Sequence, residues 1–407
     1  MKLKLDSILL FALTIPLIMN YNLAPFATPY WLFGLVFFGL TLYLLLDILN
    51  LKQKTYDSLK MILLWLILII TVGSSFNAAI IERHITHPTY KIHDMPLQQE
   101  IAINYLTHGK NPYSTTYFGT FLQQWHYSDT EVNPALYHFV LMPFYILFAV
   151  PFYFLSNHTI GFFDARIPLL FLFLMALLTG AFLIKDRSKK LLFLVLFALN
   201  PAMLPYTLEG RSDIFMFAFL FLSLFFLQRK KDFLAGILMA LSFAIKQSAW
   251  PIFPLYVSYL YFKTRNVKET FRKLIPFMVT FIIVVLPFFL WDKKAFIDST
   301  VNYLSGNLPN SYPIAGYGLG KLLNEFGVIK DLHSYYPFWI WQVLIGIPVL
   351  FFLIRWLGKE NSVARLVFSY GIFLFVFWYL SRYFNNSHLA YLSMIFLVGY
   401  FWPAEKS

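Results

Sequence analysis

The sequence predicts an all-α membrane protein, a polytopic bundle in which about twelve helices cross the bilayer, with further interfacial helices in a long outer loop. Composition is the first indication, because 59% of the 407 residues are hydrophobic and only 13% are charged, whereas roughly a quarter are charged in soluble domains. The second indication is the length of apolar runs such as 61–75 and 191–200, which need lipid or a buried bundle around them. We expect a single integral membrane domain over residues 1–407.

The cysteine count and the net charge exclude several kinds of site and partner. The chain has no cysteine, which excludes disulfides, thiolate nucleophiles and cysteine-based metal sites. Its formal charge of +12 indicates basic cytoplasmic loops rather than nucleic-acid binding. The first 20 residues resemble a signal peptide, but no small-residue cleavage site follows, so we interpret them as an uncleaved first span.

Thirteen apolar stretches are candidates for spans. They are residues 7–24, 29–49, 58–80, 134–156, 164–184, 190–206, 213–228, 233–247, 250–263, 272–291, 336–356, 363–380 and 388–404. Most lysines and arginines lie in seven short clusters between them, and the positive-inside rule places all seven in the cytoplasm.

All thirteen stretches cannot cross, because the basic clusters at 51–60 and 185–190 would then lie on opposite sides. The stretch 134–156 contains three prolines, a histidine and several tyrosines. We interpret it as an interfacial or re-entrant helix on the outer side, which leaves twelve spans and two cytoplasmic termini. The outer face then carries two long loops, 81–133 and 291–335, and long loops in compact membrane proteins usually carry function.

The first long loop contains a short amphipathic pattern. Leu97, Ile101 and Tyr105 recur every four residues and form one apolar stripe of a helix lying on the membrane surface. Gly109 ends this helix. Asp94 precedes the stripe, and it is open to two interpretations, a helix N-cap or a functional carboxylate.

Charged residues recur at the outer ends of separate spans. They are Asp94, Arg166, Glu209, Arg211, Asp213, Lys246, Arg382 and His388. Charges at membrane depth tend to mark sites, although any single cation can simply extend to the interface or pair with one acid. A carboxylate can act as general base on a hydroxyl, and arginine and lysine can bind a phosphate. Together with the surrounding lipid, these groups suit a lipid-linked phosphate donor and a hydroxyl acceptor.

Several short motifs follow one another in a recognisable order. After Asp94 they are GKNPY (109–113), NPALYH (133–138), DARIP (164–168), LNP (199–201), EGRSD (209–213) and AGILMALSFAIK (235–246). No single motif is highly specific, but their order over about residues 60–260 resembles the membrane-embedded glycosyltransferases of the C-type fold. Among these the chain most resembles polyprenol-phosphate-dependent mannosyltransferase-like proteins.

The resemblance implies an inverting glycosyltransferase that moves a hexose, with mannose as the guess, from a polyprenyl-phosphate donor to a hydroxyl of a glycan, lipid or protein. By position, Asp94 is the catalytic base, and either Glu209 or Asp213 is the second acid. The donor phosphate falls to Arg211, Lys246, Arg382 and His388, and the sugar or acceptor to Asn111, Tyr113, Tyr137 and His138. Relatives usually carry the acid after one span, so residues 1–57 are an added helical hairpin and 81–163 form the outer catalytic region.

No cofactor is required in this interpretation, and no metal ligands are assigned. Some of the resembling proteins use a divalent metal, and Asp94, Glu209 and Asp213 are the acids available for one, but they show no tight ligand spacing. The histidines at 84, 87 and 93 are a second metal alternative. We expect a multi-pass protein of the cell membrane, with its site on the outer face and no nucleic-acid partner.

Two other functions stay open. A lipid-linked glycan polymerase or ligase also works on the outer face, and its chemistry would rest on loop arginine and histidine, for which Arg382 and His388 are available. A transporter would show related halves and broken helices, and the prolines at 201, 205, 251 and 254 leave room for such breaks.

Overall fold

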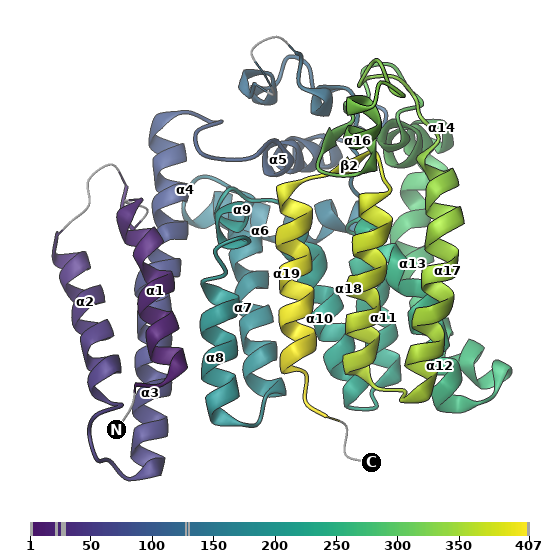
Figure 1. Ribbon diagram of the computed structural model, residues 1–407. Helices are drawn as coiled ribbons and strands as arrows, with labels where there is room; N and C mark the ends of the chain where they lie inside the picture. Colours follow the sequence, from purple (N-terminus) through teal and green to yellow (C-terminus); the bar gives the residue numbers. More distant parts are fainter. Residues whose placement is uncertain (1–2, 21–22, 26–29, 127, 129–130, 405–407) are drawn as a thin grey trace.

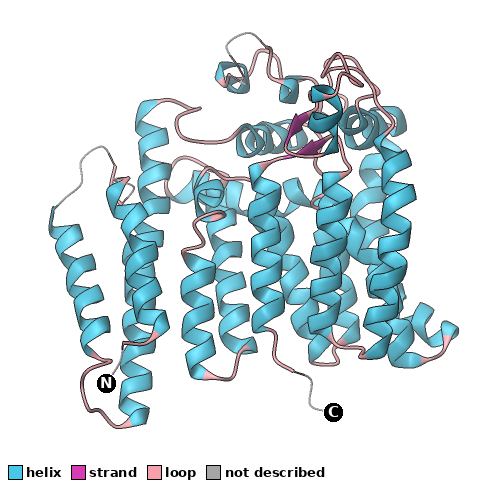
Figure 2. Cartoon of the chain, viewed as in Figure 1, coloured by secondary structure: helices cyan, strands magenta, loops and turns pink. Residues whose placement is uncertain are grey.

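The computed structural model describes residues 3–20, 23–25, 30–126, 128 and 131–404. Figures 1 and 2 show most of its helices standing side by side in one bundle. The helices of the bundle are α1 (Leu5–Met19), α2 (Tyr30–Leu45), α3 (Gln53–Leu68), α4 (Ser74–Thr86), α7 (Arg166–Leu183), α8 (Arg187–Ala198), α10 (Asp213–Gln228), α11 (Asp232–Phe243), α12 (Phe253–Thr264), α13 (Val267–Trp291), α17 (Phe338–Lys359), α18 (Val363–Tyr379) and α19 (Asn386–Phe401).

The remaining elements gather mainly at one end of the bundle. They are the helices α5 (Asp94–Thr107), α6 (Pro143–Thr159), α9 (Leu204–Leu208), α14 (Lys293–Ile297), α15 (Tyr303–Ser305) and α16 (Leu319–Glu325), the 3₁₀ turns η2 (Phe121–Gln124), η3 (Pro134–Leu136) and η4 (Gln247–Ile252), and the π turns η1 (Ile69–Gly73) and η5 (Asp298–Asn302). Two-residue strands β1 (Ala315–Gly316) and β2 (Tyr383–Phe384) pair in parallel, and they are the only strands in the described part of the chain. The predicted all-α class is therefore confirmed.

Four helical stretches within the described residues are long and apolar enough to cross a membrane. They are Gln53–Thr86, Arg166–Leu183, Val267–Trp291 and Phe338–Lys359. Shorter apolar helices accompany them, at Leu5–Met19, Tyr30–Leu45, Asp213–Gln228, Asp232–Phe243 and Val363–Tyr379. Several such helices in one bundle make this a multi-pass membrane protein of the helical class.

The two ends of the bundle differ in composition. Figure 1 shows the start of α1 and the end of α19 at the same end, together with the turns α2–α3, α7–α8, α10–α11, α12–α13 and α17–α18. These turns contain the five internal basic clusters of the sequence. The opposite end carries α5, α16 and the long loops. The edges of the first two predicted spans at 21–22 and 29, and parts of the terminal basic clusters, lie outside the described residues.

Helix α6 begins and ends at the loop-bearing end of the bundle. The N–H groups of Met142 and Phe144 donate to the carbonyl oxygens of Ile245 and Ala244, 3.0 and 2.8 Å away, just beyond the end of α11. Five residues after the end of α6, Asp164 forms an ion pair with Arg83, which lies near the C-terminal end of α4. The chain therefore returns to its starting level, as predicted for the stretch 134–156, although the helix itself starts only at Pro143.

The predicted span 190–206 is not one helix. Helix α8 ends at Ala198, and Asn200 then accepts the N–H groups of Ala202 and Met203 with its side-chain oxygen. Pro201 disfavours helical backbone at the residue before it, so the chain turns and forms the separate short helix α9.

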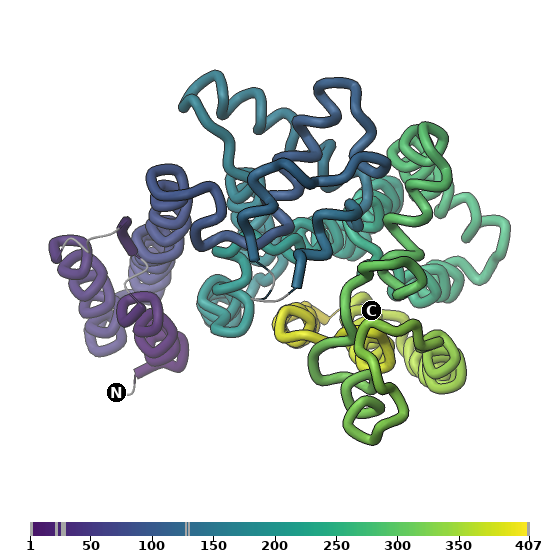
Figure 3. The backbone as a smooth tube through the Cα atoms, turned by 90° about the horizontal axis from the view of Figure 1, so that it is seen from above, coloured from purple at the N-terminus to yellow at the C-terminus, as the bar shows by residue number. Residues whose placement is uncertain are grey.

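Helices α1 to α3 form a group beside the rest of the bundle (Figure 3). Fully buried Lys60 on α3 holds this group together, because its ammonium lies 2.9 Å from Asp6 and 2.7 Å from Asp47. The hydroxyl of Tyr43 also donates to Asp6, at 2.7 Å. A buried cation needs such compensation, so this cluster fixes the N-terminal hairpin on α3, and α1 then packs against α8.

Helix α10 occupies the centre of the bundle. Nearly all of its side chains are buried, and it packs against α7 on one side and α11 on another, as expected for a helix that is apolar all round. Its first residue, Asp213, stands at the loop-bearing end. This largely buried helix begins with an acid, and that acid belongs to the site described next.

Candidate active site

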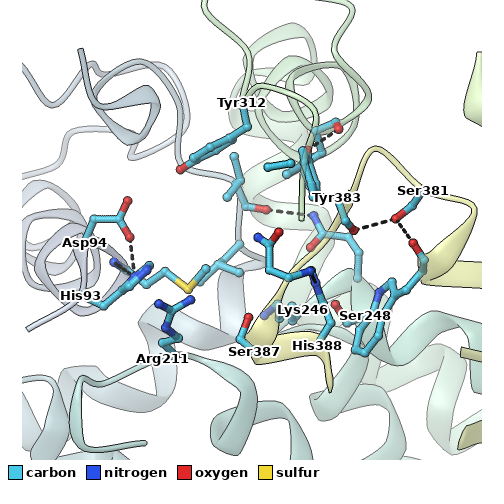
Figure 4. A pocket seen from close by; sticks show the side chains of 18 of the residues that line it. His93, Asp94, Arg211, Lys246, Ser248, Tyr312, Ser381, Tyr383, Ser387 and His388 are labelled. Carbon is cyan, nitrogen blue, oxygen red and sulfur yellow. Dashed lines mark hydrogen bonds and ion pairs between the residues drawn. The ribbon is translucent and has the colours of Figure 1, made fainter. Parts of the chain in front are cut away.

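A cavity of about 320 Å³ lies at the loop-bearing end of the bundle (Figure 4). Its walls come from the start of α5, the turn before α10, residues 246–248, the loop 304–315 and the segment 377–388. Of the sequence-predicted site residues, the structure brings four together here, namely Asp94, Arg211, Lys246 and His388. These four residues come from four different segments of the chain.

Asp94 is the first residue of α5 and not its N-cap. His93 takes the cap position, and its Nδ1 accepts the N–H of Met95 at 3.3 Å, so the N-cap interpretation of Asp94 is wrong by one residue. The carboxylate of Asp94 is almost fully buried, and its Oδ1 lies 2.5 Å from Nδ1 of His93. This contact lacks hydrogen-bond geometry, and Oδ1 has no hydrogen-bond partner among the described residues.

The pKa of Asp94 reflects two opposing effects. Burial alone would raise the pKa of the carboxyl group, but His93 next to it in its protonated form and Arg211 nearby favour the charged form, and the net pKa is lowered. Asp94 is therefore an ionised carboxylate at neutral pH, in a position where it can accept a proton.

The turn between α9 and α10 holds the backbone at the start of α5. The N–H of His93 donates to the carbonyl oxygen of Glu209, 2.8 Å away. The next residue, Gly210, has φ +90°, and a side-chain carbon there would lie 2.8 Å from Cγ of Pro96. Only glycine allows this conformation and this close approach, so the turn holds the first residues of α5 against α10.

A buried network of ion pairs connects α5 to α4. Arg83 on α4 donates to both carboxylate oxygens of Glu100, at 2.7 Å each, and to Asp164 at 2.9 Å. Arg166, which has no exposed surface, pairs with the same Asp164 at 2.7 Å. Burial acts to raise the pKa of Asp164, but the two arginines lower it overall. The predicted outer-face cation Arg166 therefore lies in the protein interior, where it joins α7 to the network that links α4 and α5.

Lys246 and Asp213 form a second ion pair. The ammonium of Lys246 lies 2.7 Å from Oδ1 of Asp213, and the two side chains are 12% and 2% exposed. Lys246 lines the cavity, whereas Asp213 does not. The acid thus stands behind the cation, and it offsets part of the cost of holding a lysine in a mostly apolar setting.

Arg211 is paired in the same way with an acid outside the cavity. Its Nε lies 3.2 Å from Oε2 of Glu209, whose side chain is 43% exposed, and its guanidinium stacks over the ring of Tyr206. Its two Nη groups have no hydrogen-bond partner in the described part of the chain. They are therefore available to a ligand in the cavity, which Arg211 lines.

His388 adds a neutral donor to the cavity. Its Nδ1 accepts the N–H of Asn385, 2.9 Å away, as part of a capping box at the start of α19. An accepting Nδ1 places the proton of a neutral imidazole on Nε2. The ring packs against Trp378, with 4.4 Å between the ring centres, so its orientation is fixed.

Arg382 is placed outside the cavity. Its guanidinium donates to four backbone carbonyl oxygens, those of Tyr312, Leu332, His333 and Ser334, and only 3% of the residue is exposed. All four carbonyls belong to the second long loop, so Arg382 holds this loop with four of its five N–H donors.

The predicted sugar-binding or acceptor-binding residues also lie outside the cavity lining. Asn111 accepts the N–H of Tyr113 with its side chain, and the hydroxyl of Tyr113 donates to the carbonyl of Leu141, which does line the cavity. Tyr137 packs on Phe118. His138 lies 3.1 Å from the hydroxyl of Ser299. These residues support the wall formed by segment 135–141.

The described residues contain no group of three or more histidine, aspartate and glutamate side chains that could hold a metal ion. Asp213 and Glu209 are each paired with a cation, and they do not gather around Asp94. Of the three loop histidines, His84 stacks on Phe162, 3.8 Å between ring centres, away from His93. The described acids and histidines of this site therefore form no ready-made metal cluster, and we derive no step through a metal ion.

Several lining residues were not predicted from the sequence, among them Gln98, Gln247, Ser248, Tyr312 and Tyr383. For Tyr312, the only signal in the sequence was the unusual length of the loop 291–335. For Tyr383, it was the position of this residue in the segment 381–388. The glutamines carry no charge and stand in no motif, so nothing in the sequence marked them.

These features define a helical membrane protein with a charged site at one end of its bundle. The model of Glycosyltransferase family 87 (GT87) matches residues 139–401. The match covers more than half of the chain, which therefore belongs to this family of membrane glycosyltransferases with the C-type fold. No curated protein sequence matches the chain. Arg211, Lys246 and His388 lie within the matched residues, and Asp94 lies before them.

Proposed function

We propose that this glycosyltransferase moves a sugar from a polyprenyl-phosphate donor to a hydroxyl acceptor, with inversion at the anomeric carbon. The observation that carries the proposal is the presence of the Asp94 carboxylate and the cations of Arg211 and Lys246 in one cavity. Direct displacement of a sugar from a phosphate requires a base and a phosphate-binding site in the same cavity.

Asp94 is the base in this mechanism. Its carboxylate accepts the proton of the acceptor hydroxyl while the hydroxyl oxygen attacks the anomeric carbon from the face opposite the phosphate. The bond between that carbon and the phosphate oxygen breaks, and the polyprenyl phosphate leaves as an anion. The lowered pKa of Asp94 keeps the carboxylate ready to accept a proton at neutral pH.

Arg211 and Lys246 stabilise the leaving phosphate. The charge on the phosphate grows as the bond breaks, so cations held in place beforehand lower the barrier. The free Nη groups of Arg211 suit two phosphate oxygens, and Nε2–H of His388 is a third donor. Asp213 and Glu209 each hold one of these cations in position, and we assign them this role in place of a direct role on the acceptor.

The outer face of the cell membrane is the proposed location of the site. We assign the twelve crossings to α1, α2, the continuous α3–α4, α7, α8, α10, α11, α12, α13, α17, α18 and α19, with α5 and α6 at the interface. The basic clusters lie at the end opposite the cavity, and the positive-inside rule makes that end cytoplasmic. An even number of crossings then puts both termini in the cytoplasm. Mannose stays the guess for the sugar, and glycan, lipid and protein hydroxyls all suit the acceptor.

The family match and the site bear on the two alternative functions, a transporter and a glycan polymerase or ligase. Family membership makes the chain an enzyme and sets the transporter aside. A lipid-linked glycan polymerase or ligase remains the rival, but of the two residues that favoured it only His388 reaches the cavity, because backbone carbonyls occupy Arg382.

The test is sugar transfer in membranes that contain equal amounts of folded wild type, Asp94→Asn or the control Glu131→Gln. Glu131 is an acid of the same outer loop that pairs with His333 at the surface. Radiolabelled polyprenyl-phosphate mannose and other hexose donors are supplied. We expect transfer by the wild type and the control, and a loss of about 10²–10⁴-fold in kcat for Asp94→Asn. Equal transfer by Asp94→Asn would remove Asp94 as the base, and no transfer from any donor by the wild type would favour the polymerase or ligase.

A further inference from the structure

Two glutamines stand next to the residues of the proposed mechanism. Gln98 follows Asp94 by one helical turn on α5, so the two side chains share a face of that helix. Gln247 directly follows Lys246 along the chain. Both glutamines line the cavity, so one amide stands beside the base and the other beside the phosphate-binding cation.

Backbone carbonyls occupy the amide nitrogens of both side chains. Nε2 of Gln98 donates to the carbonyl oxygens of Ala135 and His138, at 2.6 and 2.9 Å. Nε2 of Gln247 donates to those of Val140 and Thr300, at 2.9 and 3.0 Å. An amide nitrogen has two hydrogens, so neither glutamine has a further N–H to offer.

This bonding fixes the orientation of each amide. Oxygen and nitrogen of a glutamine look alike in shape, but only the nitrogen can donate to two carbonyl oxygens. Each Oε1 therefore points away from those carbonyls. Neither Oε1 has a hydrogen-bond partner within the described residues, and neither is among the fully buried side-chain atoms without a partner, whereas Oε1 of the neighbouring Gln99 is one of them.

We propose that Gln98 and Gln247 are specificity-determining residues that bind hydroxyl groups of the transferred sugar. Each Oε1 is an acceptor held in one direction, and a sugar hydroxyl is a donor of matching size. This inference rests on the proposed function, because it names the ligand of the same cavity. It adds that recognition works through hydroxyl hydrogens, so the site selects a sugar by which of its hydroxyls are free.

A purely bracing role makes a different prediction. If the glutamines only hold the segment 135–141 in place, their loss changes all donors equally. If Oε1 binds a sugar hydroxyl, loss of the amide and loss of that hydroxyl remove the same interaction, and the two losses do not add.

The experiment combines enzyme variants with donor analogues. Purified full-length protein in lipid nanodiscs is given short-chain polyprenyl-phosphate mannose and its four monodeoxy analogues, and both binding and transfer are measured. The variants are Gln98→Met and Gln247→Met, which keep the side-chain length and remove the amide. The control is Gln123→Met, an exposed glutamine of the outer loop. Gln247 is only half-buried and therefore provides a second position if Gln98→Met folds poorly.

For each glutamine we expect one deoxy analogue that the wild type uses at least about 30-fold less well in kcat/KM. The matching methionine variant should lose a similar factor with the parent donor and lose little more with that analogue. Equal losses with all donors in both variants would overturn the proposal. Binding without transfer in the wild type would contradict the proposed function, while the binding data would still decide the role of the glutamines. If the wild type shows no binding and no transfer with any of these donors, both the proposed function and the proposed role of the glutamines are overturned.

Discussion

The ammonium of Lys246 lies 2.7 Å from Oδ1 of Asp213, with both side chains almost fully withdrawn from the surface. Removing one partner of a buried pair leaves the other as an uncompensated charge, which costs about 3–5 kcal/mol. We therefore expect Lys246→Met to lower the free energy of unfolding by about this amount, measured by thermal unfolding in detergent.

The double variant Lys246→Met/Asp213→Asn separates stability from catalysis. It removes both charges, so most of the lost stability should return, whereas sugar transfer should stay low because no cation faces the phosphate. Recovery of full transfer in the double variant would contradict the phosphate role of Lys246. A single Lys246→Met variant as stable as the wild type would show that Asp213 does not depend on this lysine for compensation of its charge.

The pairing of His93 with Asp94 predicts a specific pH dependence. Because the pKa of Asp94 is lowered below its ordinary value of 3.8, the carboxylate stays charged as the pH falls from neutral, and its loss sets in only below that value. Transfer should therefore show no acid limb from Asp94 between about pH 8 and pH 5. His93→Gln removes a favourable neighbour and leaves burial opposed mainly by Arg211, so the pKa of Asp94 should rise.

The measurement is kcat/KM against pH for the wild type and His93→Gln. The acid limb should move upward by about one pH unit or more in the variant, with the rate at high pH largely retained. His108→Gln is the control, because His108 is an exposed histidine at the far end of α5. Coinciding profiles would mean that His93 does not set the charge of Asp94.

Much of the fold followed from simple patterns in the sequence. Apolar runs predicted the bundle, and the positions of the basic clusters led us to predict that the stretch 134–156 does not cross. Hydropathy alone did not reveal where spans break, because a run such as 190–206 is apolar on both sides of Asn200. There the side-chain hydrogen bonds of Asn200 and the constraint from Pro201 outweigh the apolar pattern.

The site was predictable only where charge marked it. Asp94, Arg211, Lys246 and His388 stood out as ionisable groups at membrane depth, and they meet in one cavity. Arg382 carried the same signal, but a sequence does not show whether substrate or backbone carbonyls bind a guanidinium. Gln98 carried no signal, because its importance comes from carbonyls about 40 residues away along the chain.

Asp164 is the acid shared by two buried arginines, Arg83 and Arg166. Asp164→Asn should cost about 3–5 kcal/mol in the free energy of unfolding, because Arg166 loses its carboxylate in a site without solvent. The control is Asp186→Asn, the exposed N-cap of α8, which should cost less, as is usual for a helix cap. Thermal unfolding of both variants gives the comparison, and equal losses would mean that the network is not the main support of α5.

Arg382 predicts how the second long loop is held. Its guanidinium donates to carbonyls of Tyr312 and of 332–334, and Tyr312 lines the cavity. Arg382→Gln should free this loop, and amide hydrogens of residues 306–335 should exchange about tenfold faster or more, while those of α5 stay unchanged. Arg365→Gln is the matched control, because Arg365 also donates to a backbone carbonyl, that of Trp356, at the opposite end of the bundle. Exchange that is unchanged in Arg382→Gln would return Arg382 to the candidates for the donor phosphate, since its guanidinium would then be free to leave the loop.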